Sequence, residues 1–124
     1  MSTPAVVDSS VWIEYLREGN KFSVVKKVIH NSRPIYIPTV VIFEVYRKLA
    51  KSLNESSALE FVALLKGCEV VDLTSNIALT AGDLSNEHQI GTADSIVLAH
   101  ACEIGVKLVT LDNDFRGIEG VVLL

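Results

Sequence analysis

The sequence predicts an α/β fold in which helices flank a five-stranded, mainly parallel sheet. Short apolar segments of strand length alternate along the chain with longer segments of helical spacing, as they do in βαβ units. Acids follow several of the apolar segments, at positions where parallel strands would end. The chain has 124 residues, of which 49% are hydrophobic and 21% are charged, which suits one domain with a sizeable core. We therefore expect a single domain over residues 1–124.

The chain is expected to open with a strand and two helices. Residues 5–8 form an apolar run that ends in an acid, which predicts a buried strand. Ser9 and Ser10 are good N-cap residues, and apolar positions at helical spacing follow them. The glycine at position 19 is expected to end this helix. Valine and isoleucine recur at helical spacing over residues 22–30, which predicts the second helix.

The remaining boundaries rest on proline, glycine and capping residues. Proline brackets a short apolar run, which predicts a strand of limited length. Asparagine and threonine are expected to cap helices, and glycine to end them. The expected elements are a strand at 35–37 between Pro34 and Pro38, a helix from Thr39 to about Ser52, a helix at 55–66 between Asn54 and Gly67, a strand at 69–72, a helix from Thr74 to about Glu87, a helix at 93–104 between Thr92 and Gly105, and strands at 107–110 and 121–123.

Four acids occupy apolar surroundings in which a carboxylate is costly to bury. Asp8 and Asp112 each follow an apolar strand, and Asp94 lies in the first turn of a helix that is apolar nearly all round. Glu44 interrupts the apolar part of another helix, where an exposed ion pair with a following cation is the alternative. Because the carboxyl ends of parallel strands share one edge of the sheet, we expect Asp8, Asp94 and Asp112 on one rim.

A divalent metal ion is the natural partner for carboxylates gathered in this way. Clustered carboxylates repel one another, and their pKa values rise unless a cation holds them ionised. Since no histidine joins them, the oxygen ligands favour Mg²⁺ or Mn²⁺ over zinc. We expect Asp8, Asp94 and Asp112 to ligate the metal, and Glu44 to ligate through water or to orient the attacking water. Asp114 either ligates, directly or through water, or only caps its turn.

Charge and composition limit the classes of partner. The net charge of −4 argues against nucleic acid, unless bound metal neutralises several acids. No apolar run approaches ~20 residues, and the two cysteines lack metal-ligand spacing. We expect a cytoplasmic protein with reduced thiols. The basic residues of the first half either border a phosphate-binding groove or lie on solvated helix faces: Arg17, Lys21, Lys26, Lys27, Arg33, Arg47, Lys48 and Lys51.

Four segments, in a fixed order and spacing, carry a resemblance to a known family. They are residues 7–10, Glu44, residues 92–96 and residues 110–115. With these segments the chain resembles the PIN domain, in particular the toxin nucleases of the VapBC type. The resemblance implies a three-layer sandwich whose strands follow the order 3-2-1-4-5. It also implies cleavage of RNA that depends on Mg²⁺ or Mn²⁺.

The resemblance also assigns expected roles to residues of this sequence. Asp8, Glu44, Asp94 and Asp112 match the acidic quartet of the family, and Asp114 matches an auxiliary acid. Ser9 and Thr110 match small hydroxyl residues near the site. His100 is bulkier than the residue often found at its position, and we expect it to be a structural histidine with satisfied hydrogen bonds.

The partners implied by the family are a second copy of the chain and a small antitoxin that covers the site. Trp12, Tyr15 and Leu16 either form an apolar groove for this antitoxin or belong to the core.

Two other functions remain open at this point. Phosphotransfer to an aspartate, as in receiver or phosphatase domains, also places an acid after the first strand. Phosphatases of the haloacid-dehalogenase type need Asp-x-Asp there, whereas this chain has Asp8-Ser9-Ser10. The second alternative is a catalytically silent module of the same fold that binds RNA or protein.

Overall fold

The computed structural model describes residues 2–124 as a sheet covered by helices on both faces. In chain order the elements are β1 (Thr3–Val7), α1 (Ser9–Arg17), α2 (Phe22–Asn31), β2 (Ser32–Pro38), α3 (Thr39–Ser52), α4 (Glu55–Leu65), β3 (Glu69–Val71), α5 (Ser75–His88), α6 (Thr92–Ile104), β4 (Lys107–Thr110), the short 3₁₀ helix η1 (Asn113–Phe115) and β5 (Val121–Leu123).

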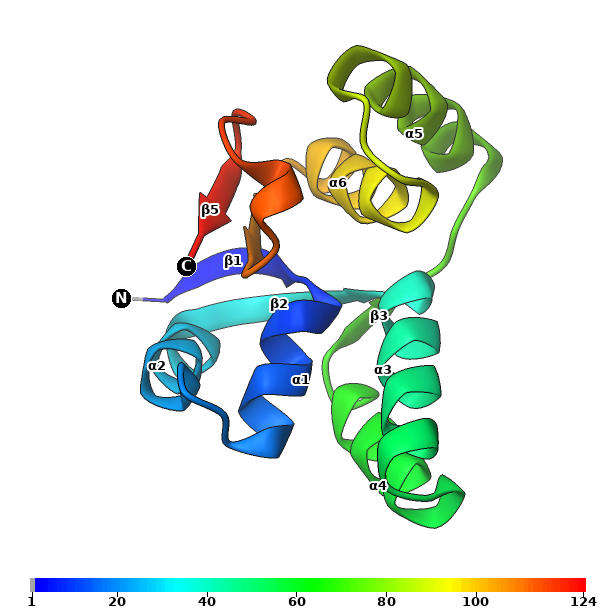
Figure 1. Ribbon diagram of the computed structural model, residues 1–124. Helices are drawn as coiled ribbons and strands as arrows, with labels where there is room; N and C mark the ends of the chain where they lie inside the picture. Colours follow the sequence, from blue (N-terminus) through cyan, green and yellow to red (C-terminus); the bar gives the residue numbers. More distant parts are fainter. Residues whose placement is uncertain (1) are drawn as a thin grey trace.

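The five strands form one sheet in the order β3-β2-β1-β4-β5, and every neighbouring pair is parallel. The first four helices lie on one side of β1 and β2, and α5 and α6 lie on the other (Figure 1). The predicted α/β class, strand order and three-layer arrangement are therefore confirmed. Since all strands point the same way, their carboxyl ends share one edge, and this edge carries the acids.

The β2 strand is longer than the proline-bracketed run that predicted it. It pairs with β1 through Thr3 opposite Ser32 and Ala5 opposite Ile35, so β2 holds one extra residue between these pairs. Pro34 lies in this interval and has no N–H to donate to the ladder. A local irregularity of this kind lets a central strand include a proline, and β2 therefore begins before it.

Two helix caps were predicted correctly and others were not. Asn54 accepts a hydrogen bond from the Ser57 N–H at 2.8 Å, and Thr74 accepts one from the Ile77 N–H at 3.2 Å. Ser9, Ser10, Thr39 and Thr92 were expected as caps but lie inside their helices. The extended residues before these helices, Asp8, Pro38 and Gly91, occupy the cap positions. The hydroxyls of Ser9 and Ser10 are consequently free for other partners.

The core is centred on β1 and β4, and the helix α6 packs against them. Val6, Val7, Val97 and Leu108 are all fully or almost fully buried. Continuous apolar runs of this kind are expected of central parallel strands that are covered on both faces. None of the helices in residues 2–124 combines the length and apolarity that crossing a membrane requires.

His100 is buried in this core, and the expectation that its hydrogen bonds are satisfied is wrong. Neither Nδ1 nor Nε2 has a hydrogen-bond partner among the described residues, and the ring is fully buried. Burial also lowers the pKa of His100, because a buried ring is harder to charge. A buried polar group without a partner destabilises the fold by about 1–3 kcal/mol.

We therefore expect the His100→Leu variant to be more stable than the wild type. Leucine has a similar volume and no polar atom, so the unfolding free energy should rise by about 1 kcal/mol, and the melting temperature by about 4 °C. Thermal unfolding followed by circular dichroism measures the difference. A lower melting temperature of His100→Leu would show that the ring nitrogens contribute favourable bonds.

Candidate metal centre

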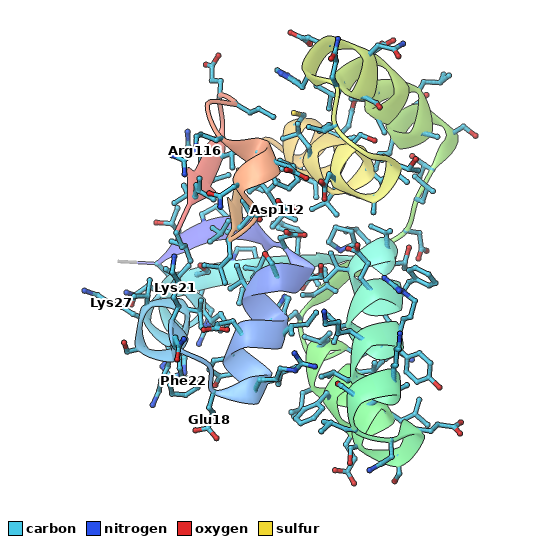
Figure 2. The ribbon with its side chains drawn as sticks, in the orientation of Figure 1. Glu18, Lys21, Phe22, Lys27, Asp112 and Arg116 are labelled. Atoms are coloured by element: carbon cyan, nitrogen blue, oxygen red, sulfur yellow. The ribbon has the colours of Figure 1, made fainter. Side chains whose placement is uncertain are left out.

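Three carboxylates converge at the carboxyl-end edge of the sheet. Asp94, Asp112 and Asp114 each offer an oxygen, and these three oxygens lie within 4.8 Å of one another. Asp112 follows β4, Asp114 lies in η1, and Asp94 comes from the first turn of α6. Figure 2 shows Asp112 beside η1, near the centre of the molecule. Asp94 and Asp112, which lie far apart in the sequence, are thus brought together as expected, and Asp8, expected with them, is not one of the three converging acids.

The turn after β4 fixes two of these acids relative to each other. Asp112 is the N-cap of η1, and its Oδ1 accepts a hydrogen bond from the Asp114 N–H at 2.9 Å. The Asp112 N–H itself donates to the Thr110 hydroxyl at 3.0 Å. Asp112, and not Asp114, therefore caps the turn, and both carboxylates lie in the converging group.

Asp8 lies deeper than the other acids and is held by hydroxyl groups. It is 4% exposed. Its Oδ2 accepts hydrogen bonds from the Thr110 hydroxyl at 2.8 Å and the Ser10 hydroxyl at 3.0 Å. The two hydroxyl oxygens also lie 3.3 Å apart. Each hydroxyl carries a single proton, so when both protons point to Asp8 this last contact is not a hydrogen bond. The arrangement favours an ionised Asp8 that accepts both.

Glu44 lies at the boundary between α3 and α1. Its Oε1 accepts a hydrogen bond from the Ser9 hydroxyl at 3.1 Å, and its side chain is partly buried. The α1 and α3 helices both begin at the carboxyl-end edge of the sheet, which is why these two residues meet. Glu44 faces inward, and it is not one of the three acids whose oxygens converge within 4.8 Å.

Burial and repulsion from neighbouring acids raise the pKa values of Asp94, Asp8 and Glu44. Burial, followed by repulsion from Asp112 and Asp8, raises the pKa of Asp94 from 3.8 to about 7. Burial also raises the pKa of Asp8, against the opposing effect of its hydroxyl donors. Burial likewise raises the pKa of Glu44, and Ser9 and Arg47 partly offset this rise. The cluster holds more negative charge than its surroundings neutralise, and a cation would relieve it.

The donor set fits a hard divalent cation. The converging atoms are all carboxylate oxygens, which Mg²⁺ and Mn²⁺ prefer and zinc does not. Asp94, Asp112 and Asp114 would hold the ion, with Asp8 and Glu44 adjacent to it. This group of acids differs in membership from the group expected from the sequence. Asp114, expected as an auxiliary, lies inside the converging group, whereas Asp8 lies behind it.

Sequence reasoning missed Ser10 as a site residue. Besides donating to Asp8, its Oγ accepts a hydrogen bond from the Leu111 N–H at 3.0 Å, and so connects α1 to the segment after β4. Its place two residues after an acid that ends a strand was the available signal, but that place was interpreted as a helix cap. Trp12 is 6% exposed and belongs to the core, so its interpretation as a groove residue is wrong. Tyr15 and Leu16 pack partly buried against the same core.

We expect the Thr110→Val variant to weaken both the fold and any metal site. Valine keeps the shape but removes one donor to the buried Asp8 and the acceptor of the Asp112 N–H. A hydrogen bond to a charged group contributes about 1.5–3 kcal/mol, and loss of such supporting contacts lowers metal affinity about 10- to 100-fold. Chemical unfolding and Mn²⁺ titration calorimetry measure the two effects. Thr110→Ser keeps the hydroxyl and should behave as wild type; equal losses in both variants would refute the argument.

Comparisons with known proteins agree with this geometry. The family model described as "PIN domain" matches residues 5–121 of the chain. A solved toxin–antitoxin complex from Klebsiella pneumoniae is 26% identical, with a TM-score of 0.80 over 95% of each chain. No curated protein matches the chain by sequence.

Two further solved structures are alike in fold. A Mycobacterium tuberculosis toxin of the VapC type, described as cleaving the sarcin–ricin loop, is 17% identical with a TM-score of 0.80, over 94% of this chain and 96% of that one. The DNA-bound VapBC complex from Salmonella typhimurium is 22% identical with a TM-score of 0.74, over 98% and 97%. At these identities the likeness concerns the fold.

Proposed function

The chain belongs to the PIN domain family, and on this premise we propose that it is a metal-dependent endoribonuclease, a toxin of the VapC type. The observation that carries the proposal is the convergence of carboxylate oxygens of Asp94, Asp112 and Asp114 within 4.8 Å, with none of these acids in a salt bridge among the described residues. A carboxylate whose pKa is raised by burial and by neighbouring acids, as that of Asp94 is, at the ligand-binding edge of a parallel sheet, is typical of a functional site.

The proposed reaction is hydrolysis of an RNA phosphodiester bond by water. A bound Mg²⁺ or Mn²⁺ would lower the pKa of a water molecule and stabilise charge on the phosphate oxygens. Asp94, Asp112 and Asp114 provide the ligand oxygens, and Asp8 completes the set from behind. Glu44 orients the attacking water from the α3 side.

Three hydroxyls hold the acids in position for this reaction. Thr110 and Ser10 donate to Asp8 and partly offset the rise in its pKa, and Ser9 donates to the carboxylate of Glu44. Supporting contacts of this kind orient metal ligands and tune their basicity. We assign Ser9, Ser10 and Thr110 to positioning and not to the chemical step.

The same proposal includes the partners and setting of the family. Two of the similar solved structures are toxin–antitoxin complexes, so we propose a small antitoxin of the VapB type as partner. We further propose a homodimer in the cytoplasm, and a single PIN domain that occupies residues 1–124. The α1 residues Tyr15 and Leu16 remain candidates for contact with the antitoxin, but Trp12 does not.

A nuclease assay tests the proposed function directly. Purified protein is stripped of metal with EDTA and incubated with total RNA, alone and after Mg²⁺ or Mn²⁺ is restored. We expect cleavage with either metal and none with EDTA. A chain that binds RNA but leaves it intact under all conditions would be a silent module of the PIN fold, and the proposal would then fail.

A further inference from the structure

An exposed aromatic ring lies beside the carboxylate site. Phe43 on α3 is 59% exposed, and it directly precedes Glu44, which faces Ser9. One helical step places its ring roughly 100° around α3 from the site-facing carboxylate. The α3 helix begins at the edge of the sheet where the acids gather (Figure 1). A single exposed apolar residue means little by itself, so its neighbours decide what it indicates.

Arg47 adds a positive charge beside the exposed Phe43 ring. Its Cζ lies 5.7 Å from the centroid of the Phe43 ring, one helical turn further along α3. This is the geometry of a cation–π contact. The same guanidinium acts on the site, because it partly offsets the rise in the pKa of Glu44. The pair is therefore an exposed flat surface with a positive charge, adjacent to an acidic centre.

The charge of α3 indicates a polyanionic partner. The helix carries three cations, Arg47, Lys48 and Lys51, against the single acid Glu44. All three cations are exposed, although the chain as a whole has a net charge of −4. A second copy docking through the same face would bring the cations of both copies into one interface, because a two-fold interface uses the same surface of each copy, and Glu44 is the only acid of α3 that could pair with them. A phosphate backbone instead matches their charge.

We propose that Phe43 and Arg47 form a platform on which one base of single-stranded RNA stacks next to the phosphate that is cut. Unstacked bases are held in this way by aromatic rings and by guanidinium planes. The inference rests on the proposed function and adds to it the two residues that hold an unpaired base at the cleavage site. A duplex keeps its bases stacked and gains nothing from the platform.

Equilibrium binding separates stacking from general adhesion. A fluorescent single-stranded RNA of about 12 nucleotides is titrated with protein in Mg²⁺, by anisotropy, in an Asp112→Asn background that prevents cleavage. Phe43→Ala should raise the dissociation constant about tenfold, as expected for one stacked base. Phe43→Leu keeps apolar area without a ring and should lose as much. Phe43→Trp keeps a ring and should bind at least as well as the unmodified background.

Matched controls test position and charge. Leu64 is also exposed, but it lies near the amino ends of β2 and β3, away from the acids, so Leu64→Ala should leave binding unchanged. Arg47→Gln should weaken binding more than Lys51→Gln, although each removes one charge from α3, because Arg47 alone contacts the ring. The dissociation constant for the corresponding duplex should be the same for the unmodified background and for Phe43→Ala.

Several results would overturn the platform. These are equal affinities of Phe43→Leu and Phe43→Trp, equal effects of Arg47→Gln and Lys51→Gln, or an absence of single-strand binding. If Phe43→Ala changes the oligomeric state measured by native mass spectrometry and leaves RNA binding unaffected, the ring belongs to a protein contact instead. The proposed function fails separately, when the unmodified protein cleaves no RNA in Mg²⁺ or Mn²⁺. In that case the binding comparison still decides whether a base stacks on Phe43.

Discussion

We expect the Asp94→Asn variant to cleave RNA at least about a hundredfold more slowly than the wild type. Removing a residue that only supports a metal ligand already lowers metal affinity or activity about 10- to 100-fold, and the loss of a ligand should be at least as large. Asp94 is one of the three converging acids and the one whose pKa the cluster raises to about 7. Asparagine keeps the shape and one oxygen but not the charge that attracts the cation. The measurement is kcat/KM on a defined RNA at saturating Mn²⁺.

The control for this variant is Asp83→Asn. Asp83 is an exposed acid on α5, outside the converging group, so the same chemical change there should leave cleavage unaffected. Binding of Mn²⁺ by calorimetry should fall with Asp94→Asn and not with Asp83→Asn. An Asp94→Asn protein that cleaves RNA at the wild-type rate would show that the reaction does not use this carboxylate.

The sequence was sufficient to predict where the acids gather. An acid at the end of a parallel strand lies at the carboxyl-end edge of the sheet, and the alternation of elements predicted parallel strands. The order of the strands was implied by the family resemblance. Asp8 and Asp112 were placed in this way, and Asp94 by its position in the first turn of a helix. These expectations depended on the backbone path alone, which apolar periodicity indicates well.

The hydroxyl network could not be predicted in the same way. Ser9 and Ser10 favour helix caps by local propensity, but Asp8 already occupies the cap position of α1 with extended backbone. The two hydroxyls then turn to Glu44 and Asp8, which are partners that only the folded chain supplies. His100 shows the same limit, since no sequence pattern reveals whether a buried ring finds a donor or an acceptor.

The last prediction concerns the stability of the metal-free protein, which should fall as the pH rises from about 4 to about 7. The pKa of Asp94 is about 7 in the folded chain against its ordinary value of 3.8. Between these values the folded state binds a proton that the unfolded state has released. Raising the pH therefore favours unfolding across this window, and above the folded pKa the penalty stays constant. Burial raises the pKa values of Asp8 and Glu44 too, and these groups act in the same direction.

Each pH unit between two pKa values corresponds to about 1.4 kcal/mol, but Asp94 is partly exposed and solvent screens it. We therefore expect a loss of about 1–2 kcal/mol between about pH 4 and about pH 7. Urea unfolding in EDTA measures it, and Asp94→Asn isolates the contribution of this carboxylate from that of the histidines. The variant should be less sensitive to pH, and parallel profiles for the two proteins would contradict the assignment.

Divalent metal should reverse this loss, because it binds the ionised cluster of the folded state. At about a hundred times its dissociation constant, a ligand that binds only the folded chain adds about 2.7 kcal/mol to stability. The gain should be full at about pH 8 and should decline below the folded pKa of about 7, where the metal must displace a proton from Asp94. Asp94→Asn should gain much less from Mn²⁺ at every pH. The same acids would thus destabilise the metal-free fold and hold the ion that its proposed activity requires.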